Sequence, residues 1–142
     1  MLPNFTPRRN TPTVEESYTN DYNDAAVVIF SRSSGEGWDN PRTMEWNGTS
    51  YTSGGRGQLV PGARSMSDHY LQLDQNESDL LKYLGGKFNK VVVLLNTPTQ
   101  FETGFLDDPG HYGYHENLKA ALWLGYPGKT GIRALGRILN GE

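Results

Sequence analysis

Cysteine is absent from this chain of 142 residues. Without thiols the protein has no disulfide scaffold, no thiolate metal site and no cysteine nucleophile. Long apolar runs are also missing: none approaches the roughly 20 residues that a membrane-spanning helix needs. We therefore expect a soluble chain with no membrane partner. Its length fits one domain that buries roughly two thirds of its unfolded surface.

Excess positive charge is lacking as well. The formal net charge is −3, so no broad basic face is expected and nucleic acid is not a predicted partner. The first residues lack the basic start and apolar stretch of a signal peptide. On this basis we slightly favour a cytoplasmic location.

Three short apolar runs are present, and each ends at polar residues or glycine. They cover residues 25–30 and 91–95 and, as a weaker copy that includes Lys119, residues 118–124. Unbroken apolar runs of this length are typical of strands buried on both faces, as in parallel sheets. We therefore predict neighbouring parallel strands at residues 25–31, 91–95 and 120–124.

Helix signals lie between these runs. Asp74 as an N-cap, with Glu77 three residues later, predicts a helix near residues 76–84. Thr97, followed by proline and then by glutamine at the third helical position, predicts a second helix over residues 98–106.

Two further helices are expected nearer the ends of the chain. Residues 14–23 are acidic and indicate a short helix. Residues 130–139 predict a last helix that directs Ile132, Leu135 and Leu139 inward.

Alternating helices and buried strands define the expected fold class, α/β, with a three-layer sandwich, a mainly parallel sheet and helices on both faces. Residues 1–20 read as an N-terminal tail or linker, and residues 21–142 as the sandwich domain. Residues 40–72, rich in glycine, serine and threonine, do not fit the alternation. Such a long loop is either functional or a surface insertion, and both interpretations stay open.

A cluster of candidate site residues follows the first strand. Glu36 lies between two glycines, so it can project into a cleft at the carboxyl edge of the sheet, where open α/β sheets bind ligands. Trp38 offers a flat surface against which sugar rings stack, and Asp39 adds a second carboxylate. The alternative is a glycine-rich turn in which Glu36 is solvated and Asp39 caps the loop.

Other motifs are weaker. The Gly128-Lys129-Thr130 run resembles the end of a phosphate loop, but the required earlier glycine is missing. His111 and His115 lie on an expected loop, where helical metal-ligand spacing does not apply. We therefore predict no metal and no cofactor.

Several segments together resemble family 3 glycoside hydrolases. The residues 31–39, SRSSGEGWD, are similar to the family's SRxSGEGxD segment. Later segments agree in order and spacing over residues of about 24 to 142: YLQL at 70–73, VVVLLN at 91–96, ALWLGYPG at 121–128 and LGRILNGE at 135–142. Asn40 departs from the arginine that often follows the aspartate.

The resemblance concerns the α/β sandwich domain and not the (β/α)8 barrel that carries the family's aspartate nucleophile. It implies a domain of a retaining β-glycosidase, in which Glu36 is the acid/base residue, as in many bacterial members. Ser34, Trp38 and Asp39 are then expected to bind substrate. The implied partners are a β-linked glucoside or xyloside and the barrel domain, and the segment is interpreted as an excised or split part of a longer enzyme.

One carboxylate cannot carry out double displacement, so the isolated domain is expected to be inactive as an O-glycosyl hydrolase. If Glu36 proves dispensable, Asp39, Glu45 or Asp68 becomes the alternative carboxylate. The competing hypothesis from another class is a non-catalytic, flavodoxin-like α/β binding or interaction module that uses the same edge of the sheet.

Overall fold

The computed structural model describes residues 14–32, 37, 62–63, 68–107 and 116–142. In these residues, three parallel strands form one sheet in the order β1-β2-β3, namely β1 (Ala26–Ser31), β2 (Val91–Asn96) and β3 (Leu118–Trp123). The four helices are α1 (Val14–Asn20), α2 (Gln75–Gly85), α3 (Gly104–Asp107) and α4 (Gly128–Leu139). This arrangement confirms the α/β class and the three predicted parallel neighbours.

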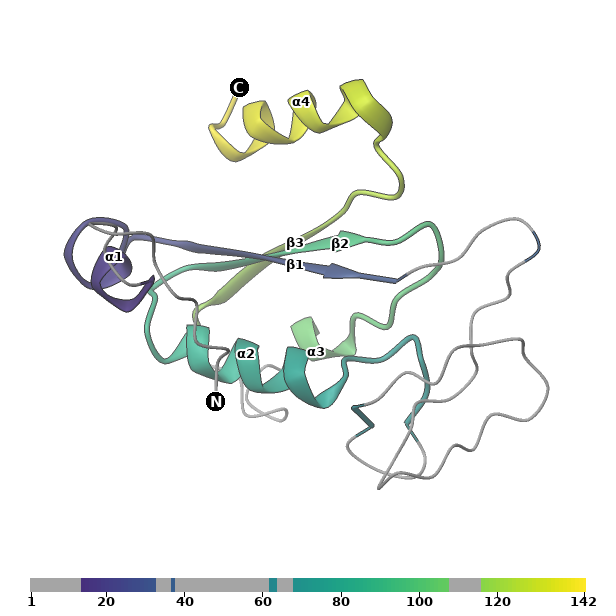
Figure 1. Ribbon diagram of the computed structural model, residues 1–142, viewed down its shortest axis with the longest axis horizontal. Helices are drawn as coiled ribbons and strands as arrows, with labels where there is room; N and C mark the ends of the chain where they lie inside the picture. Colours follow the sequence, from purple (N-terminus) through teal and green to yellow (C-terminus); the bar gives the residue numbers. More distant parts are fainter. Residues whose placement is uncertain (1–13, 33–36, 38–61, 64–67, 108–115) are drawn as a thin grey trace, which may run out of the picture.

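The hydrophobic core lies between the sheet and the helices α2 and α3, which share one side of it in Figure 1. In the register, Val28 lies beside Val93 and Phe30 beside Leu95. The strands point these alternate side chains toward one face. They pack there with Leu73, Leu81, Phe88, Val91 and Phe105.

Helix α2 begins as the sequence predicts. The Asp74 carboxylate accepts a hydrogen bond of 2.7 Å from the Glu77 backbone N–H, and the Glu77 carboxylate accepts one of 3.0 Å from the Asp74 N–H. This reciprocal capping box satisfies two backbone donors that a helix start otherwise leaves unpaired. Ser78, Leu81 and Gly85 then form the buried side of the helix.

The prediction that the strands are buried on both faces is wrong for β1 and for β3, in which no residue is buried. Val27 and Ile29 are 49% and 58% exposed, whereas Val28 and Phe30 between them are buried. The continuous apolar sequence did not reveal this, because apolar side chains on both faces read the same whether or not both faces are covered.

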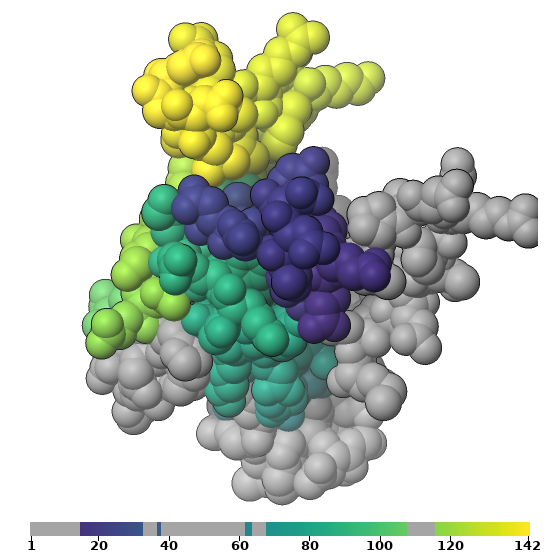
Figure 2. Space-filling model, turned by 90° about the vertical axis from the view of Figure 1, so that its left-hand side faces the viewer, coloured from purple at the N-terminus to yellow at the C-terminus, as the bar shows by residue number. Residues whose placement is uncertain are grey.

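The last helix leaves this face of the sheet largely uncovered. Helix α4 lies on the side of the sheet opposite α2 and α3 in Figure 1, and none of its residues is buried. Figure 2 shows it in yellow, projecting at one end of the molecule. Ile132 and Leu139 are 50% and 43% exposed, so the prediction that they point into a core is wrong for the described part of the chain.

The predicted helix over residues 98–106 is also largely wrong, since only α3 is helical there. The Thr97 hydroxyl accepts a hydrogen bond from the Thr99 N–H, in a local turn. The Glu102 N–H then donates to the Leu71 carbonyl at 3.0 Å instead of to a carbonyl one helical turn earlier. Tertiary contacts therefore hold residues 98–103 out of the helical conformation.

Helix α1 lies inside the segment 1–20 that was predicted to be a tail. Its Tyr18 packs against the hydrophobic core, with its ring 5.2 Å from that of Phe88. The predicted boundary between tail and domain at residue 20 stays a prediction.

Candidate functional site at the carboxyl edge of the sheet

Arg32 follows directly after β1 and is the most highly bonded side chain at this edge of the sheet among the described residues. Only 5% of its surface is exposed. Its guanidinium makes two hydrogen bonds to the Glu77 carboxylate, of 2.6 and 2.7 Å, and donates to the carbonyls of Ser31, Tyr70 and Gln72. One buried residue thus ties the end of β1 to helix α2 and to the segment before it.

Aromatic rings complete the surroundings of this guanidinium. Its central carbon lies 5.2 Å from the ring centre of Tyr70 and 4.7 Å from that of Phe101. Both distances are within the range of attractive cation–π contacts. Phe101 is therefore held against the residue at which the chain leaves β1.

Charge and burial oppose each other at this cluster. Burial lowers the pKa of Arg32, whereas the hydrogen bonds and the negative charge of Glu77 raise it. The effect of Glu77 prevails, so the net shift of the Arg32 pKa is upward. Burial is the main reason that the pKa of the Asp74 carboxyl is raised, and the hydrogen bond from the Glu77 N–H opposes it. Arg32 therefore stays protonated at neutral pH, and its ion pair with Glu77 serves as a structural link.

The four predicted site residues, Ser34, Glu36, Trp38 and Asp39, lie outside the described residues, as does the alternative Glu45. Gly37, between two of them, is described: its φ is +77°, a left-handed conformation that favours glycine. Asp68, the other alternative carboxylate, is buried with 7% of its surface exposed. Burial makes Asp68 less accessible to a substrate than a carboxylate on an open loop.

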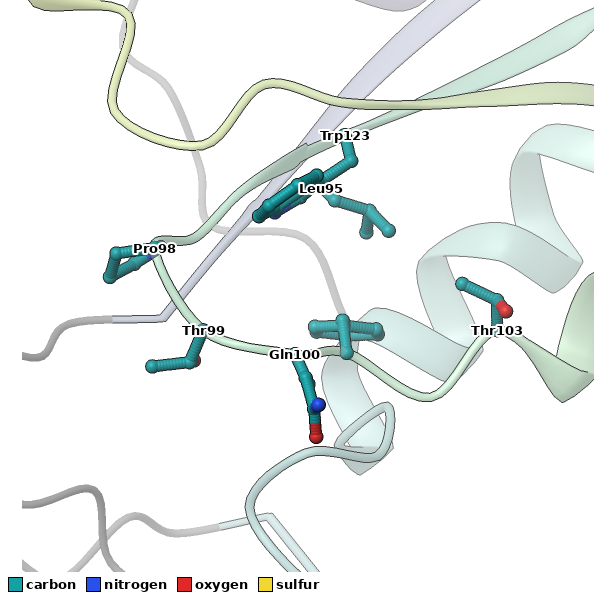
Figure 3. Close-up of a pocket in the computed structure, with 7 residues that line it drawn as sticks. Leu95, Pro98, Thr99, Gln100, Thr103 and Trp123 are labelled. Atoms are coloured by element: carbon teal, nitrogen blue, oxygen red, sulfur yellow. The ribbon is translucent and has the colours of Figure 1, made fainter.

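A pocket of about 310 Å³ opens at the carboxyl ends of β2 and β3. Figure 3 shows Trp123 and Leu95 on one side, and Thr99, Gln100 and Thr103 on the other. Pro98 and Phe101 complete the lining. The pocket exists because residues 98–103 are not helical and lie across the ends of the strands.

Trp123 is the largest side chain of the pocket, and its orientation is fixed. Its indole N–H donates a 2.8 Å hydrogen bond to the Thr97 carbonyl, while 66% of the residue's surface stays exposed. An aromatic ring that is both exposed and held in place is a ready surface for stacking. None of the described residues that line the pocket is ionisable, so their chemistry suits binding and not proton transfer.

Sequence reasoning missed Trp123, Phe101 and the bonding role of Arg32. A tryptophan one residue before the end of the predicted strand 120–124 was a usable signal, since open α/β sheets bind ligands at the carboxyl ends of their strands. Phe101 gave no such signal, because it lay inside a predicted helix.

Within the described residues, no group of three or more histidines, aspartates or glutamates is placed to hold a metal ion. Their helices include none long and apolar enough to cross a membrane.

The fold and the pocket define the class of protein, an α/β domain with a pocket at the carboxyl ends of its parallel strands. A search of family models then identifies the family. The model of the glycosyl hydrolase family 3 C-terminal domain matches residues 9–142, so the chain belongs to this family. Searches of curated proteins and of solved structures returned no significant match.

Membership of this family makes the chain a glycosidase-related domain. In general terms, the family implies glycoside substrates and a partner barrel domain. The match confirms the family resemblance that the sequence segments carry.

Proposed function

We propose that this domain supplies the acid/base carboxylate, Glu36, to a retaining β-glycosidase whose nucleophile lies on a barrel domain. The proposed substrates are β-linked glucosides or xylosides. Ser34, Trp38 and Asp39 would form part of the sugar-binding cleft. Family membership over residues 9–142 supports the reaction class.

The single observation that best supports this role is the anchoring of Arg32. The segment that contains Glu36 leaves the sheet at this residue, whose five hydrogen bonds fix its start. A general acid must be held close to its productive position, because small displacements are costly in rate. Arg32 thus provides a fixed starting point for the segment that carries Glu36.

The chemistry needs two carboxyl groups about 5–5.5 Å apart. The nucleophile attacks the anomeric carbon while Glu36 donates its proton to the leaving-group oxygen. Glu36 then takes a proton from the water that hydrolyses the glycosyl-enzyme. To donate a proton near neutrality, its pKa must rise above the ordinary value of about 4.3, which burial under a barrel domain would achieve.

The test compares the chain alone with the chain joined to a family barrel domain. Alone, the 142 residues should hydrolyse aryl β-glycosides no faster than background. Joined to the barrel they should support turnover. Glu36→Gln should then lower the turnover rate about 10²–10⁴-fold for a substrate with a poor leaving group. A loss smaller than tenfold would show that Glu36 is not the acid.

A second candidate function is non-catalytic binding by a flavodoxin-like α/β module. The uncharged pocket beside Trp123 favours it, since such a pocket can bind a ligand without any reaction. The joined protein separates the two functions: a binding module would show no turnover that depends on Glu36.

A further inference from the structure

The pocket between Trp123 and residues 98–103 has the character of a site for one neutral ring. Its volume, about 310 Å³, lies at the lower end of small-molecule sites, which span roughly 300–1,000 Å³. Leu95, Pro98, Phe101 and Trp123 supply an apolar and aromatic lining, and the polar side chains of the described lining residues carry two hydroxyls and one amide. These described residues offer no counter-charge to a charged ligand.

Trp123 is prepared for such a ligand. Its indole N–H is already bonded to the Thr97 carbonyl, so stacking on the ring leaves no polar group unpaired. The same bond fixes the side chain before a ligand arrives, which removes part of the entropic cost of binding. Covering the exposed surface of an aromatic ring is favourable in free energy.

The position of the pocket indicates which part of a substrate would enter it. Phe101 lines the pocket and also lies 4.7 Å from the Arg32 guanidinium. Arg32 is four residues from Glu36 in the chain, so the pocket adjoins the base of the segment that carries the proposed acid. In glycoside hydrolysis the acid contacts the leaving-group oxygen, so the group beside it is the aglycone.

We propose that this pocket binds the aglycone of the substrate and that it selects neutral, ring-shaped aglycones such as phenols. Identifying the bound ring as an aglycone rests on the proposed function. The binding of a neutral ring itself does not depend on catalysis by Glu36.

The first experiment measures binding to the chain alone by two-dimensional ¹H–¹⁵N NMR, with the indole N–H signal of Trp123 as the reporter. Phenyl β-glucoside and phenol should both shift this signal in a saturable way. Methyl β-glucoside, which has the sugar but no ring aglycone, should shift it at least tenfold less at equal concentration. Equal shifts from methyl and phenyl glucosides would overturn the proposal, as would no shift from phenol.

Variants locate the ligand. Thr103→Arg, at the exposed rim, should weaken phenol binding at least tenfold by placing a charged chain at the pocket mouth. Trp123→Ala should do the same, and Thr103→Arg keeps the test valid if Trp123→Ala fails to fold. The matched control is Tyr126→Ala, which removes an exposed aromatic ring outside the pocket and should leave binding unchanged. Equal loss of binding in the control would contradict the assignment.

The second experiment uses the chain joined to a barrel domain. Thr103→Arg should raise the KM for phenyl β-glucoside at least fivefold, while the KM for methyl β-glucoside stays within twofold of the unsubstituted enzyme. Phenol binding with no effect of Glu36→Gln on turnover would refute the proposed acid and keep the pocket. A strong effect of Glu36→Gln with no phenol binding would refute the pocket and keep the acid.

Discussion

Replacing Arg32 by methionine should destabilise the domain more than any change to a surface ion pair. The substitution keeps an apolar chain of similar length but leaves the Glu77 carboxylate, only 13% exposed, without its cation. It also leaves three backbone carbonyls without the donor that they now have. Removing one partner of a buried ion pair typically lowers the free energy of unfolding by about 3–5 kcal/mol.

Two further variants separate the charge of Arg32 from its geometry. Arg32→Lys keeps the charge but cannot bond both carboxylate oxygens and three carbonyls, so we expect an intermediate cost of about 1–3 kcal/mol. Adding Glu77→Gln to Arg32→Met removes the unpaired charge, so the double variant should be more stable than Arg32→Met alone.

The assay is urea unfolding followed by far-ultraviolet circular dichroism. With a slope of roughly 1–3 kcal/mol/M, Arg32→Met should lower the midpoint by about 1 M or more. Lys90→Met is the control, because Lys90 pairs with Asp24 at 3.2 Å in an exposed setting, where a pair is worth about 0–1 kcal/mol. If Arg32→Met costs no more than Lys90→Met, Arg32 is not the anchor of this edge.

Further changes test the fold and its ionisation. Leu81→Ala, in the core beneath the sheet, should cost about 2–5 kcal/mol in urea unfolding, whereas Ile132→Ala on the exposed helix α4 should stay within about 0.5 kcal/mol; equal costs would contradict the one-sided core. Asp74→Ala should cost about 1 kcal/mol through loss of the cap, but Asp74→Asn keeps the cap. Folding raises the pKa of Asp74 from 3.8, so the stability that this group contributes falls as the pH rises through the raised pKa. Asp74→Asn should remove that fall from the plot of unfolding free energy against pH, and an unchanged plot would refute this. The hydrogen bond between the Tyr18 and Tyr83 hydroxyls raises the pKa of the Tyr18 phenol to about 12. Tyr83→Phe removes this bond and should lower that pKa in an NMR titration of the tyrosine ring carbons, and no decrease would contradict the cause.

The sheet and helix α2 could be predicted because their signals are local. The three apolar runs mark the strands, and Asp74 with Glu77 marks the start of the helix. Each signal lies within the element that it specifies, so no distant contact was needed to read it.

The segment after β2 could not be predicted in the same way. Thr97 and the following proline are genuine helix-start signals, but Phe101 packs against Arg32, and the Glu102 N–H bonds to the Leu71 carbonyl. These partners lie about 30 to 70 residues away in the sequence. The pocket at Trp123 depends on the same contacts, so it was missed with them.

Burial of an apolar face was the other feature that the sequence could not settle. Ile29 and Ile132 have the periodicity of core residues, yet both are half exposed or more in the described chain. Periodicity shows which side chains share a face, and only packing shows whether that face is covered. The roles of Glu36 and its neighbours stay predictions.

The most direct test of the central claim is the product that azide forms with the Glu36→Ala variant of the chain joined to its barrel domain. If Glu36 is the acid/base, the nucleophile still forms the α-linked glycosyl-enzyme from an activated aryl β-glucoside. Azide then attacks from the opposite face without base assistance. We predict that azide restores part of the rate and that the product is the β-glycosyl azide. An α-glycosyl azide would show that Glu36 is the nucleophile instead, and no rescue together with unimpaired hydrolysis would show that it has neither role.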